Sequence, residues 1–366
     1  MESNKNIFEK LGLPKNPIML APLAGVSDHP FRRVCTNKGA DLTYVEMISA
    51  TAMLYQSQKT YDMLKRHESE KVLGVQITGR SAEDVGQACE ILNKMNFDTI
   101  DINMGCPVKK VVKTGSGSGI LKDPERVYQT VKAARAATDL PLSAKIRIGW
   151  DRSMVNYEEV TQAINEGGAD FMTVHGRTRS EDYSFPVDLE SIAHLKQLSK
   201  IPVVGNGNIF SKQDADHMTN ATGVDGLMVS RGALGNPWVF DEIKLGSVQV
   251  SVDEWVKAVE DHLRWQQEEY GDTGAGAICM RKHLLWYVKG WDGAKILRER
   301  INEASSLTAA MDLLRMFVDH LKAKETGFRK KVGPSDVEGR FSWDPKWEMD
   351  RKLDRGVGDD CLENSQ

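Results

Sequence analysis

Residues 99–107 read Thr-Ile-Asp-Ile-Asn-Met-Gly-Cys-Pro, and our prediction of the fold starts from this stretch. Polar and apolar residues alternate from Asp101 to Asn103, which places these two side chains on one face of a strand. A glycine and a proline then bracket Cys106, and neither residue type continues a strand or a helix easily. The stretch therefore predicts a buried strand that delivers an asparagine and a cysteine to a turn at its end.

Two interpretations of Cys106 are open at this point. Most free cysteines are small, buried hydrophobic residues. A thiol that is held on a turn at the end of a strand is also exposed enough to react and placed firmly enough to be aimed. The surroundings of the turn favour chemistry.

Seven further runs have the length and composition of strands, and helical segments separate most of them. Ser81 and Ser211 each stand three positions before an acidic residue, and Asp123 precedes a proline, which are signals for the start of a helix. A doubly wound sheet usually shows fewer strands and a GxGxxG motif after the first, which this sequence lacks. Eight strands alternating with helices over about 240 residues predict an α/β fold, a (β/α)8 TIM barrel. The seven runs are residues 18–22, 42–47, 73–78, 142–148, 171–175, 202–205 and 226–230.

Polar residues or glycines follow every one of these predicted strands. In barrel enzymes the loops at the carboxyl ends of the strands build the active site. These positions are therefore the first candidates for a functional site. They are residues 22–25, Glu46, Gln76, 103–106, 145–147, 175–177, 205–208 and 230–232.

Composition narrows the class of protein. The chain has 366 residues, a hydrophobic fraction of 40% and a charged fraction of 27%, as expected for a globular protein with a full core. A net charge of −4 argues against a surface coated by nucleic acid but leaves a local basic groove possible. Five scattered cysteines without a CxxC pair favour a reducing cytoplasm over a disulfide framework or a thiolate zinc site. We expect no bound metal.

The N-terminal residues lack a basic region followed by an apolar run and a cleavage site. The longest apolar run, residues 17–26, contains two prolines and is too short to span a bilayer. We therefore expect a cytoplasmic protein that does not engage a membrane, and we expect it to be a monomer.

The sequence pattern changes after about residue 250. Long amphipathic segments at 252–269, 277–289 and 305–324 predict a small helical bundle. Between Arg281 and Arg300 six basic residues alternate with aromatic ones, a pattern that by itself most often marks a solvated helix face with aromatic anchors. The predicted domains are a barrel at 1–245, a helical domain at 246–328 and a charged, flexible tail at 329–366.

Two glycine-containing segments suit an anion. Residues 203–209 and 230–232 end the seventh and eighth predicted strands, and glycine lets backbone N–H groups approach a phosphate. Barrel enzymes commonly bind phosphate at this place in the strand order.

Basic side chains alternate on the fifth and sixth strands. Lys145 and Arg147 point the same way, as do His175 and Arg177. A lysine directed into the mouth of a barrel needs an anionic or carbonyl partner, and the pyrimidine edge of a reduced flavin is one. Cys106 lacks a peptidase-like context, and an unperturbed thiol keeps its proton at neutral pH, so a general acid is favoured over a nucleophile.

These motifs together resemble the tRNA dihydrouridine synthases over about residues 14–325. The segment Arg281–Tyr287, Arg-Lys-His-Leu-Leu-Trp-Tyr, is similar to the bacterial B-type branch. The combination of the cysteine turn with His-Gly-Arg-Thr-Arg is the most specific part of the resemblance. The motifs that carry it are 19–25, 101–107, 145–147, 175–179, 205–208, 230–232 and 236–238.

The resemblance implies an oxidoreductase that acts on a CH–CH group, with FMN bound in the barrel and a helical domain that helps to hold tRNA. NADPH, or NADH, would reduce the flavin. A hydride would pass from flavin N5 to C6 of a uracil in the tRNA D loop, and Cys106 would protonate C5. The B-type likeness points to position 17 of the tRNA. The target base must leave the folded tRNA to enter a pocket, and basic residues around the mouth would make binding salt-sensitive.

The resemblance also implies roles for individual residues. Asn103 would orient the uracil. Pro22, Leu23 and Ala24 would line the flavin ring, and Gln76, Lys145 and His175 would contact FMN. The ribityl phosphate would be held by Asn206, Gly207, Asn208, Ser230, Arg231 and Gly232. The residues nearest the RNA would be Lys109, Lys113, Arg147, Arg177 and Arg179.

Three alternatives share parts of this pattern. An FMN-dependent dehydrogenase or reductase of a free pyrimidine, such as dihydroorotate, has the barrel and the flavin but no RNA; the basic segment 281–300 and the lysines around 109–113 argue against it. A tRNA-binding protein without chemistry would have no reason to keep Cys106, Asn103 and Lys145 together. A flavin-free, phosphate-binding barrel such as an aldolase would use Lys145 as a Schiff-base amine.

Overall fold

The structure is a computed structural model that describes residues 6–291 and 293–323. The predicted tail at 329–366 lies outside these residues. The described residues form two compact units: residues 6–27, 40–209 and 213–230, here called the barrel unit, and residues 28–39, 210–212, 231–291 and 293–323, here called the helical unit. Each unit is described by itself below.

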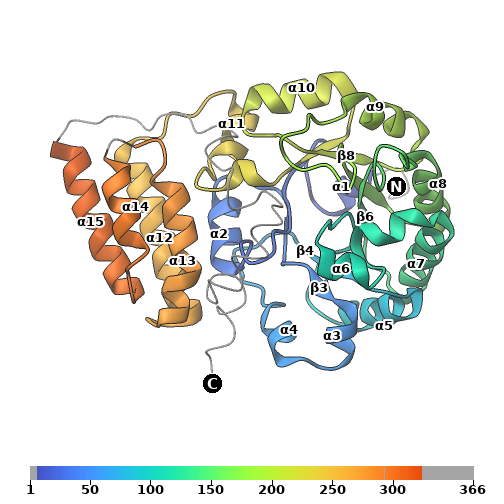
Figure 1. Ribbon diagram of the computed structural model, residues 1–366, viewed down its shortest axis with the longest axis horizontal. Helices are drawn as coiled ribbons and strands as arrows, with labels where there is room; N and C mark the ends of the chain where they lie inside the picture. Colours follow the sequence, from blue (N-terminus) through green and yellow to red (C-terminus); the bar gives the residue numbers. More distant parts are fainter. Residues whose placement is uncertain (1–5, 292, 324–366) are drawn as a thin grey trace. The chain divides into compact units, whose positions relative to one another are not determined.

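Parallel strands form the core of the barrel unit (Figure 1). Around the sheet they follow the order β1-β9-β8-β7-β6-β5-β4-β2, and the short β3 (Ile48–Ser49) pairs with β4 off this path. A parallel bridge between Met19 and Leu42 joins the first strand to the chain just before β2, which nearly closes the barrel. The predicted (β/α)8 barrel is confirmed. The strands are β1 (Ile18–Leu20), β2 (Thr43–Tyr44), β4 (Leu73–Thr78), β5 (Thr99–Met104), β6 (Leu142–Arg147), β7 (Phe171–His175), β8 (Val203–Asn206) and β9 (Gly226–Val229).

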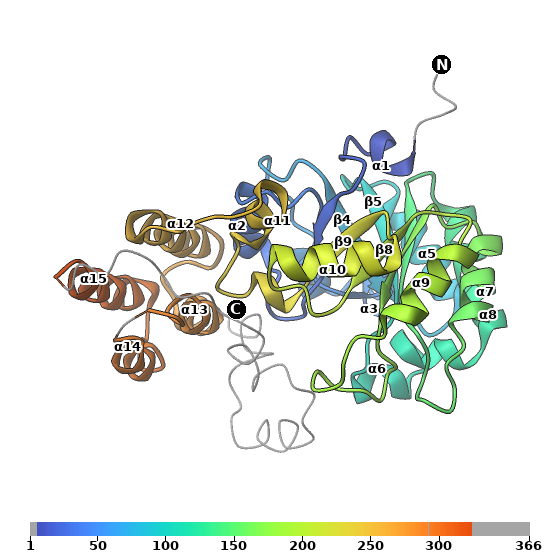
Figure 2. The ribbon, with the colours of Figure 1, turned by 90° about the horizontal axis from the view of Figure 1, so that it is seen from above.

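Helices cover the outer side of this sheet (Figures 1 and 2). The predicted start signals act as expected at Ser81, whose hydroxyl accepts from the N–H of Asp84, and at Asp123, whose carboxylate accepts from the N–H of Arg126. The helices are α3 (Ala50–Leu54), α4 (Gln58–Asp62), α5 (Ala82–Leu92), α6 (Lys109–Lys113), α7 (Pro124–Ala137), α8 (Tyr157–Gly167), α9 (Leu189–Leu198), α10 (Lys212–Thr222) and a 3-10 helix at Gly117–Lys122.

Apolar side chains fill the end of the barrel near the chain's first helix, α1 (Ile7–Lys10). Phe8 is fully buried and meets Phe171 edge to face, with ring centroids 5.5 Å apart. Met19, Leu42 and Val204 belong to the same cluster. This end of the barrel is filled by apolar side chains, whereas the predicted site residues lie farther along the strands and in the loops that follow them.

The strand register brings the predicted site residues side by side. Gln76 lies opposite Asp101, and Asn103 lies opposite Lys145. His175 has Arg147 on one side and Asn206 on the other. Five strands thus place polar side chains at neighbouring positions of one sheet edge.

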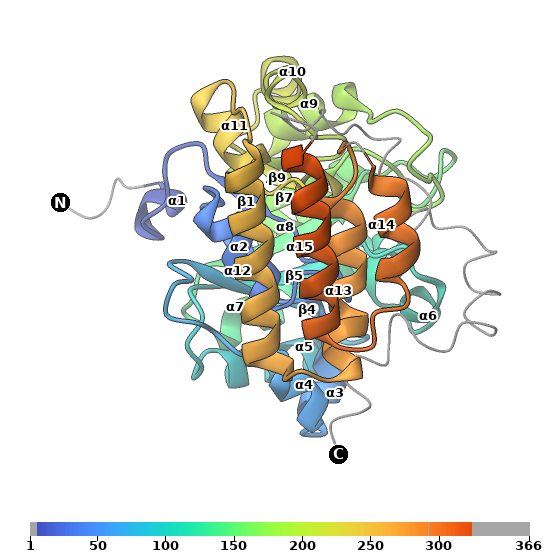
Figure 3. The ribbon, with the colours of Figure 1, turned by 90° about the vertical axis from the view of Figure 1, so that its left-hand side faces the viewer.

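The helical unit has its own core of aromatic and aliphatic side chains. Figure 3 shows several of its helices side by side. Trp255 is fully buried and meets Trp291 and Phe317 edge to face. The three predicted helical segments are confirmed within a few residues, and α14 is an addition to them. The helices are α2 (His29–Asn37), α11 (Val239–Leu245), α12 (Val252–Tyr270), α13 (Gly274–Tyr287), α14 (Ala294–Ile301) and α15 (Leu307–Ala323). Within the ranges that the structure describes, no helix is long and apolar enough to cross a membrane.

Helix α2 groups with these later helices although it follows the first barrel strand in sequence. Phe31 is fully buried against the rings of His262 and His283, with centroids 6.0 and 4.9 Å away. The guanidinium of Arg33 lies 4.2 Å from the centroid of the Trp265 ring. The compact units therefore differ from the predicted division at residue 245, because the buried face of α2 matches α12 and α13.

Substitution of two glycines in the helical unit distinguishes the cost of backbone strain from the cost of a steric clash. Gly235 and Gly246 both have positive φ, 64° and 98°, but an added Cβ would overlap the backbone of Trp286 at Gly235 and meet nothing within 4 Å at Gly246. We expect Gly246→Ala to cost about 1 kcal/mol of unfolding free energy and Gly235→Ala about 3 kcal/mol or more. Urea denaturation of the two variants measures the difference, and equal losses would contradict the predicted contact.

Candidate active site

A chain of hydrogen bonds crosses β4, β5 and β6 and runs along β5 to its carboxyl end. The hydroxyl of Ser143 and the amide of Gln76 both donate to the Asp101 carboxylate, at 2.6 and 2.7 Å. The amide of Asn103 donates to Gln76 Oε1 at 2.8 Å. Asn103 Oδ1 then accepts the backbone N–H of Cys106 at 2.9 Å. The predicted strand and the predicted cysteine turn are thus connected side chain by side chain.

The turn that carries Cys106 is held from a second side by the 3-10 helix. The hydroxyl and the N–H of Ser118 donate to the Cys106 carbonyl at 2.8 and 3.0 Å. Gly117 has φ 56°, and a Cβ there would come within 2.9 Å of the same carbonyl oxygen. The cysteine is partly buried, and burial raises the pKa of its thiol despite the opposing charges of Arg147 and Lys145. Cys106 therefore keeps its proton at neutral pH.

Lys145 of β6 lies opposite Asn103, a member of this chain of hydrogen bonds. Burial and the charge of Arg147 lower the pKa of Lys145 to about 8, while Asp101 and Cys106 act in the opposite direction. Among the residues that the structure describes, Lys145 makes neither a hydrogen bond nor an ion pair. An ammonium in this position is a donor for an acceptor that the protein itself does not supply.

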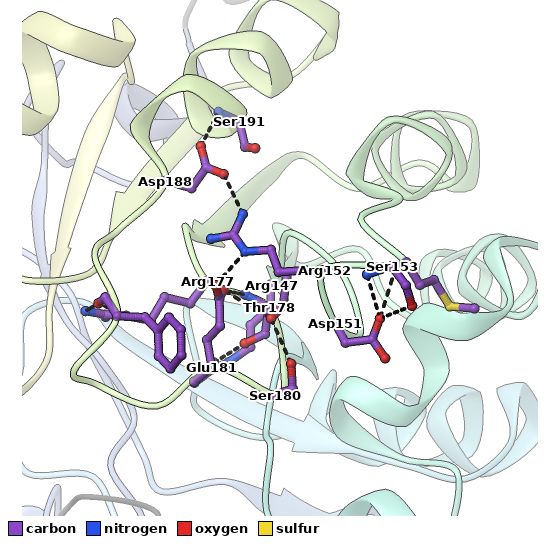
Figure 4. A network of polar contacts seen from close by, with 12 residues as sticks. Arg147, Asp151, Arg152, Ser153, Arg177, Thr178, Ser180, Glu181, Asp188 and Ser191 are labelled. Atoms are coloured by element: carbon purple, nitrogen blue, oxygen red, sulfur yellow. Dashed lines mark hydrogen bonds and ion pairs between the residues drawn. The ribbon is translucent and has the colours of Figure 1, made fainter.

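Arg147 links the cysteine turn to the loop after β7. Figure 4 shows it beside Thr178 and Glu181 of that loop. Its side chain is 5% exposed, and its Nε donates to the carbonyl of Gly105 at 3.1 Å. Its Nη1 donates to the carbonyls of Thr178 and Glu181 at 2.6 and 3.3 Å. These bonds hold three stretches of backbone in one arrangement.

Arg177 is fully buried. Its Nε donates to the carbonyl of Phe185 at 2.8 Å, and Nη2 donates to Asn208 Oδ1 at 3.1 Å. Its Nη1 lies 3.2 Å from His175 Nε2. A guanidinium can only donate, so this nitrogen of His175 accepts and the ring proton lies on Nδ1.

The expected place of Arg147 and Arg177 nearest the RNA does not fit their burial. Both guanidinium groups are engaged by main-chain carbonyls inside the barrel unit. A guanidinium removed from water needs several acceptors, and loop carbonyls provide them here.

An acidic network completes this loop, and the sequence analysis missed it. Glu181 is 5% exposed and accepts from the N–H of Thr178 at 2.7 Å. Its other oxygen binds Arg152 Nε at 2.6 Å, and Arg152 also binds Asp188 at 3.0 Å (Figure 4). The Glu181-Asp182 pair that follows the basic motif was the available signal.

Three of the predicted RNA contacts are at least partly exposed. Lys109 and Lys113 lie at the two ends of α6; Lys109 is partly exposed and Lys113 is exposed. Arg179 lies 4.6 Å from the centroid of the Trp150 ring, and Lys122 Nζ lies 3.6 Å from it. Positive charge therefore gathers on α6 and around Trp150.

The predicted phosphate loop joins the ends of β8 and β9. The amide of Asn206 donates to the Met228 carbonyl at 2.7 Å and to Ser230 Oγ at 3.0 Å. Gly207 has φ 126°, and a Cβ there would come within 2.9 Å of the His175 ring. Asn208 has φ 52°, a left-handed conformation that asparagine tolerates. The loop therefore exposes backbone where bulkier residues would not fit.

The remaining candidates follow β1 and β9 in the chain. Pro22, Leu23 and Ala24 follow β1, where the N–H of Leu23 donates to Ser27 Oγ at 2.8 Å. Arg231 and Gly232 are buried residues of the helical unit, and the Arg231 guanidinium lies 5.3 Å from the Phe210 ring.

One group in the described ranges has ligand atoms close enough for a metal. Atoms of Asp28, His262 and His283 lie within 4.8 Å of one another in the helical unit. The positive charge of Lys282 acts on all three residues, and burial lowers the pKa of both imidazoles, His262 to about 3. A neighbouring ammonium opposes a second cation, so the group does not by itself indicate a metal centre.

Comparison with known proteins decides the family. The family model described as "Dihydrouridine synthase (Dus)" matches residues 19–324. The chain belongs to the dihydrouridine synthase family. The resemblance inferred from the motifs is confirmed, including its B-type character.

Individual relatives cover most of the chain. tRNA-dihydrouridine synthase B of Pseudomonas syringae pv. tomato is 37% identical over 82% of this chain and 91% of its own length. The protein of the same name from Pasteurella multocida is 34% identical over 79% and 88%. "Probable tRNA-dihydrouridine synthase 1" of Synechocystis is 34% identical over 83% and 87%. Among solved structures, histamine dehydrogenase from Rhizobium sp. 4-9 matches with a TM-score of 0.50 and 12% identity over 87% of this chain and 63% of its own, a likeness of fold alone.

The Asp101 carboxylate predicts a pH dependence of stability. Burial raises the pKa of Asp101 from 3.8 to about 6. Between these two pKa values the folded state holds a proton that the unfolded state has already released, so this group's contribution to stability falls as pH rises through that window and levels off above about pH 6. Asp101→Asn removes the effect. We expect its unfolding free energy, minus that of the parent, to rise by about 1 kcal/mol between pH 5 and pH 7.5, as measured on flavin-free protein. A constant difference would contradict the shifted pKa.

Proposed function

We propose that this protein reduces a uridine of the tRNA D loop to 5,6-dihydrouridine, with FMN as cofactor and NADPH as reductant. The observation that carries the proposal is the Asn103–Cys106 turn beside Lys145, in a barrel whose curated relatives are named tRNA-dihydrouridine synthases. A cytoplasmic location and a monomeric state remain expectations of this proposal.

The residues present fit FMN. Lys145 offers an ammonium without a protein partner in the described ranges, which suits the anionic pyrimidine edge of a reduced flavin. Gln76 has a buried amide with a fixed direction, and His175 accepts at Nε2 from Arg177. Asn206, Gly207, Asn208 and Ser230 would hold the phosphate, and Arg231 and Gly232 remain candidates from sequence. Bound FMN supplies hydride chemistry, with NADPH as the source of electrons.

Cys106 is the proton donor of the proposal. The raised pKa keeps the proton on Sγ at neutral pH, and the bonds from Asn103 and Ser118 hold the turn on both sides. A thiol placed in this way can deliver its proton to C5 of the uracil as C6 is reduced. Asn103 keeps one amide N–H beyond the bond to Gln76, which can meet a uracil carbonyl.

Binding of RNA falls to the exposed cations. Lys109, Lys113 and Arg179 would contact the phosphate backbone around a base turned out of the tRNA. Arg147 and Arg177 are assigned a different task from the one expected, because their guanidinium groups hold the loops that shape the mouth.

Replacement of the thiol tests the acid. Cys106→Ala should bind FMN and tRNA as the parent does and form dihydrouridine at least about 100-fold more slowly. The substitution removes the proton donor but leaves the backbone bonds that hold the turn. Product is measured by mass spectrometry of digested tRNA. Near-parent turnover would remove Cys106 from the acid role.

Replacement of the lysine tests the flavin contact. Lys145→Met should weaken FMN binding by about tenfold or more, because a charged hydrogen bond to the cofactor is lost. Lys110→Met, on the exposed side of α6, is the matched control and should bind FMN normally. Fluorescence titration of flavin-free protein gives both dissociation constants. Equal constants would argue against the assignment of Lys145.

A visible spectrum of the purified protein tests cofactor, reductant and substrate together. Flavin bands should bleach with NADPH under anaerobic conditions and return on addition of unmodified tRNA. Return with a free pyrimidine but not with tRNA would instead favour the small-molecule dehydrogenase. Bands that stay absent after FMN is added would overturn the proposal.

A further inference from the structure

We propose that Asp101 is the positioning residue of this site: its carboxylate sets the direction of the amides of Gln76 and Asn103, and its negative charge lies two residues along β5 from Asn103, the register partner of Lys145. The inference deepens the proposed function, on which its consequence for turnover rests. Asp101 was singled out by the strand pattern, yet neither hydride transfer nor proton donation uses it.

The direction of the hydrogen bonds follows from the two end groups, one of which can only accept and the other only donate. An ionised carboxylate only accepts, so Gln76 must turn its NH₂ toward Asp101 and its oxygen toward Asn103. Asn103 must then donate to Gln76 and keep its oxygen for the backbone N–H of Cys106. A backbone N–H only donates, so both ends of the chain demand the same orientation of the two amides.

Burial stabilises this orientation of the Gln76 and Asn103 amides. Asp101 is fully buried and Gln76 is 1% exposed, so water does not compete for their bonds. Bonds of amide and hydroxyl groups to a carboxylate are stronger than neutral ones and lose little to screening in such surroundings. Without an acceptor at position 101, the Gln76 amide would be anchored from Asn103 alone.

The same carboxylate acts on Lys145. Asp101 supports the charged form of this lysine against burial and against the charge of Arg147 on the same strand. Cys106, on the turn after β5, acts in the same direction only where its thiol is ionised. The groups that act on Asp101 itself are Ser143 and Lys145 from β6 and Gln76 from β4, and Tyr44 of β2 is a further titratable group that interacts with its charge. Removing the carboxylate should therefore move the loss of the lysine charge to lower pH.

These two tasks can be separated by the choice of substitution. Asp101→Ala removes both the acceptor and the charge. Asp101→Asn removes the charge but keeps the direction, since Oδ1 accepts from Gln76 while Nδ2 donates to the hydroxyl of Ser143, which can also accept. The asparagine variant should thus rescue the turn and leave the effect on Lys145 visible.

Thr173→Val is the matched control. Thr173 lies on β7 in register with Lys145, is fully buried, and its hydroxyl has no hydrogen-bond partner. The change is nearly isosteric and alters a buried polar side chain of the same barrel outside the hydrogen-bond chain.

The first measurement is alkylation of Cys106 by iodoacetamide in flavin-free protein, followed by peptide mass spectrometry. Asp101→Ala should loosen the turn and speed alkylation by about fivefold or more, while Asp101→Asn and Thr173→Val stay within about twofold of the parent. Turnover and FMN affinity of Asp101→Ala should fall by about tenfold or more.

The second measurement is the pH dependence of FMN affinity. Binding should weaken at alkaline pH as Lys145 loses its proton, and this limb should move to lower pH in Asp101→Asn but not in Thr173→Val. A residue that merely supports the fold would not shift the limb. If Asp101→Ala does not fold, this comparison alone decides.

The inference is overturned if Asp101→Ala behaves like Thr173→Val, if Asp101→Asn alkylates as fast as Asp101→Ala, or if the alkaline limb does not move. Both measurements are made without tRNA. Failure of the parent protein to reduce tRNA would therefore defeat the proposed function while the role of Asp101 is tested on its own.

Discussion

A buried carboxylate that can only accept hydrogen bonds organises the polar end of this barrel. Asp101 receives donors from β4 and β6, and the orientation it imposes passes through two amides to the backbone of Cys106. The arrangement is possible because the three strands are neighbours in a parallel sheet, with Gln76 opposite Asp101 and Asn103 opposite Lys145. A change in the geometry of any of these hydrogen bonds would move the backbone of Cys106 and therefore its thiol.

Two buried arginines hold the loops of the same site through hydrogen bonds to backbone carbonyls. Arg147 and Arg177 hold loop carbonyls rather than face outward, and Glu181 closes the loop through Thr178 and Arg152. A guanidinium has five donors in a rigid plane, which suits it to fasten several segments of backbone at once. Charge that faces solvent is left to the lysines of α6 and to Arg179, which is partly exposed.

The two ends of the barrel divide the tasks of stability and chemistry. Phe8 and Phe171 belong to an apolar cluster near α1, and such burial supplies stability without polar partners. The helical unit has a separate aromatic core around Trp255. At the polar end Lys145 is half-buried, and this partial removal from water together with the charge of Arg147 lowers its pKa.

Local patterns were sufficient for much of this description. Alternation identified β5, cap residues identified the starts of α5 and α7, and the polar residues after each strand identified the edge on which the site lies, because each of these features depends on neighbours in sequence. The motifs also indicated the family. Only the tertiary structure decided that Arg147 and Arg177 are buried, that Ser143 and Glu181 support the site, and that α2 packs with α12. Those facts depend on which strands and helices become neighbours in space, and a side chain's partners across a sheet lie dozens of residues away in the chain.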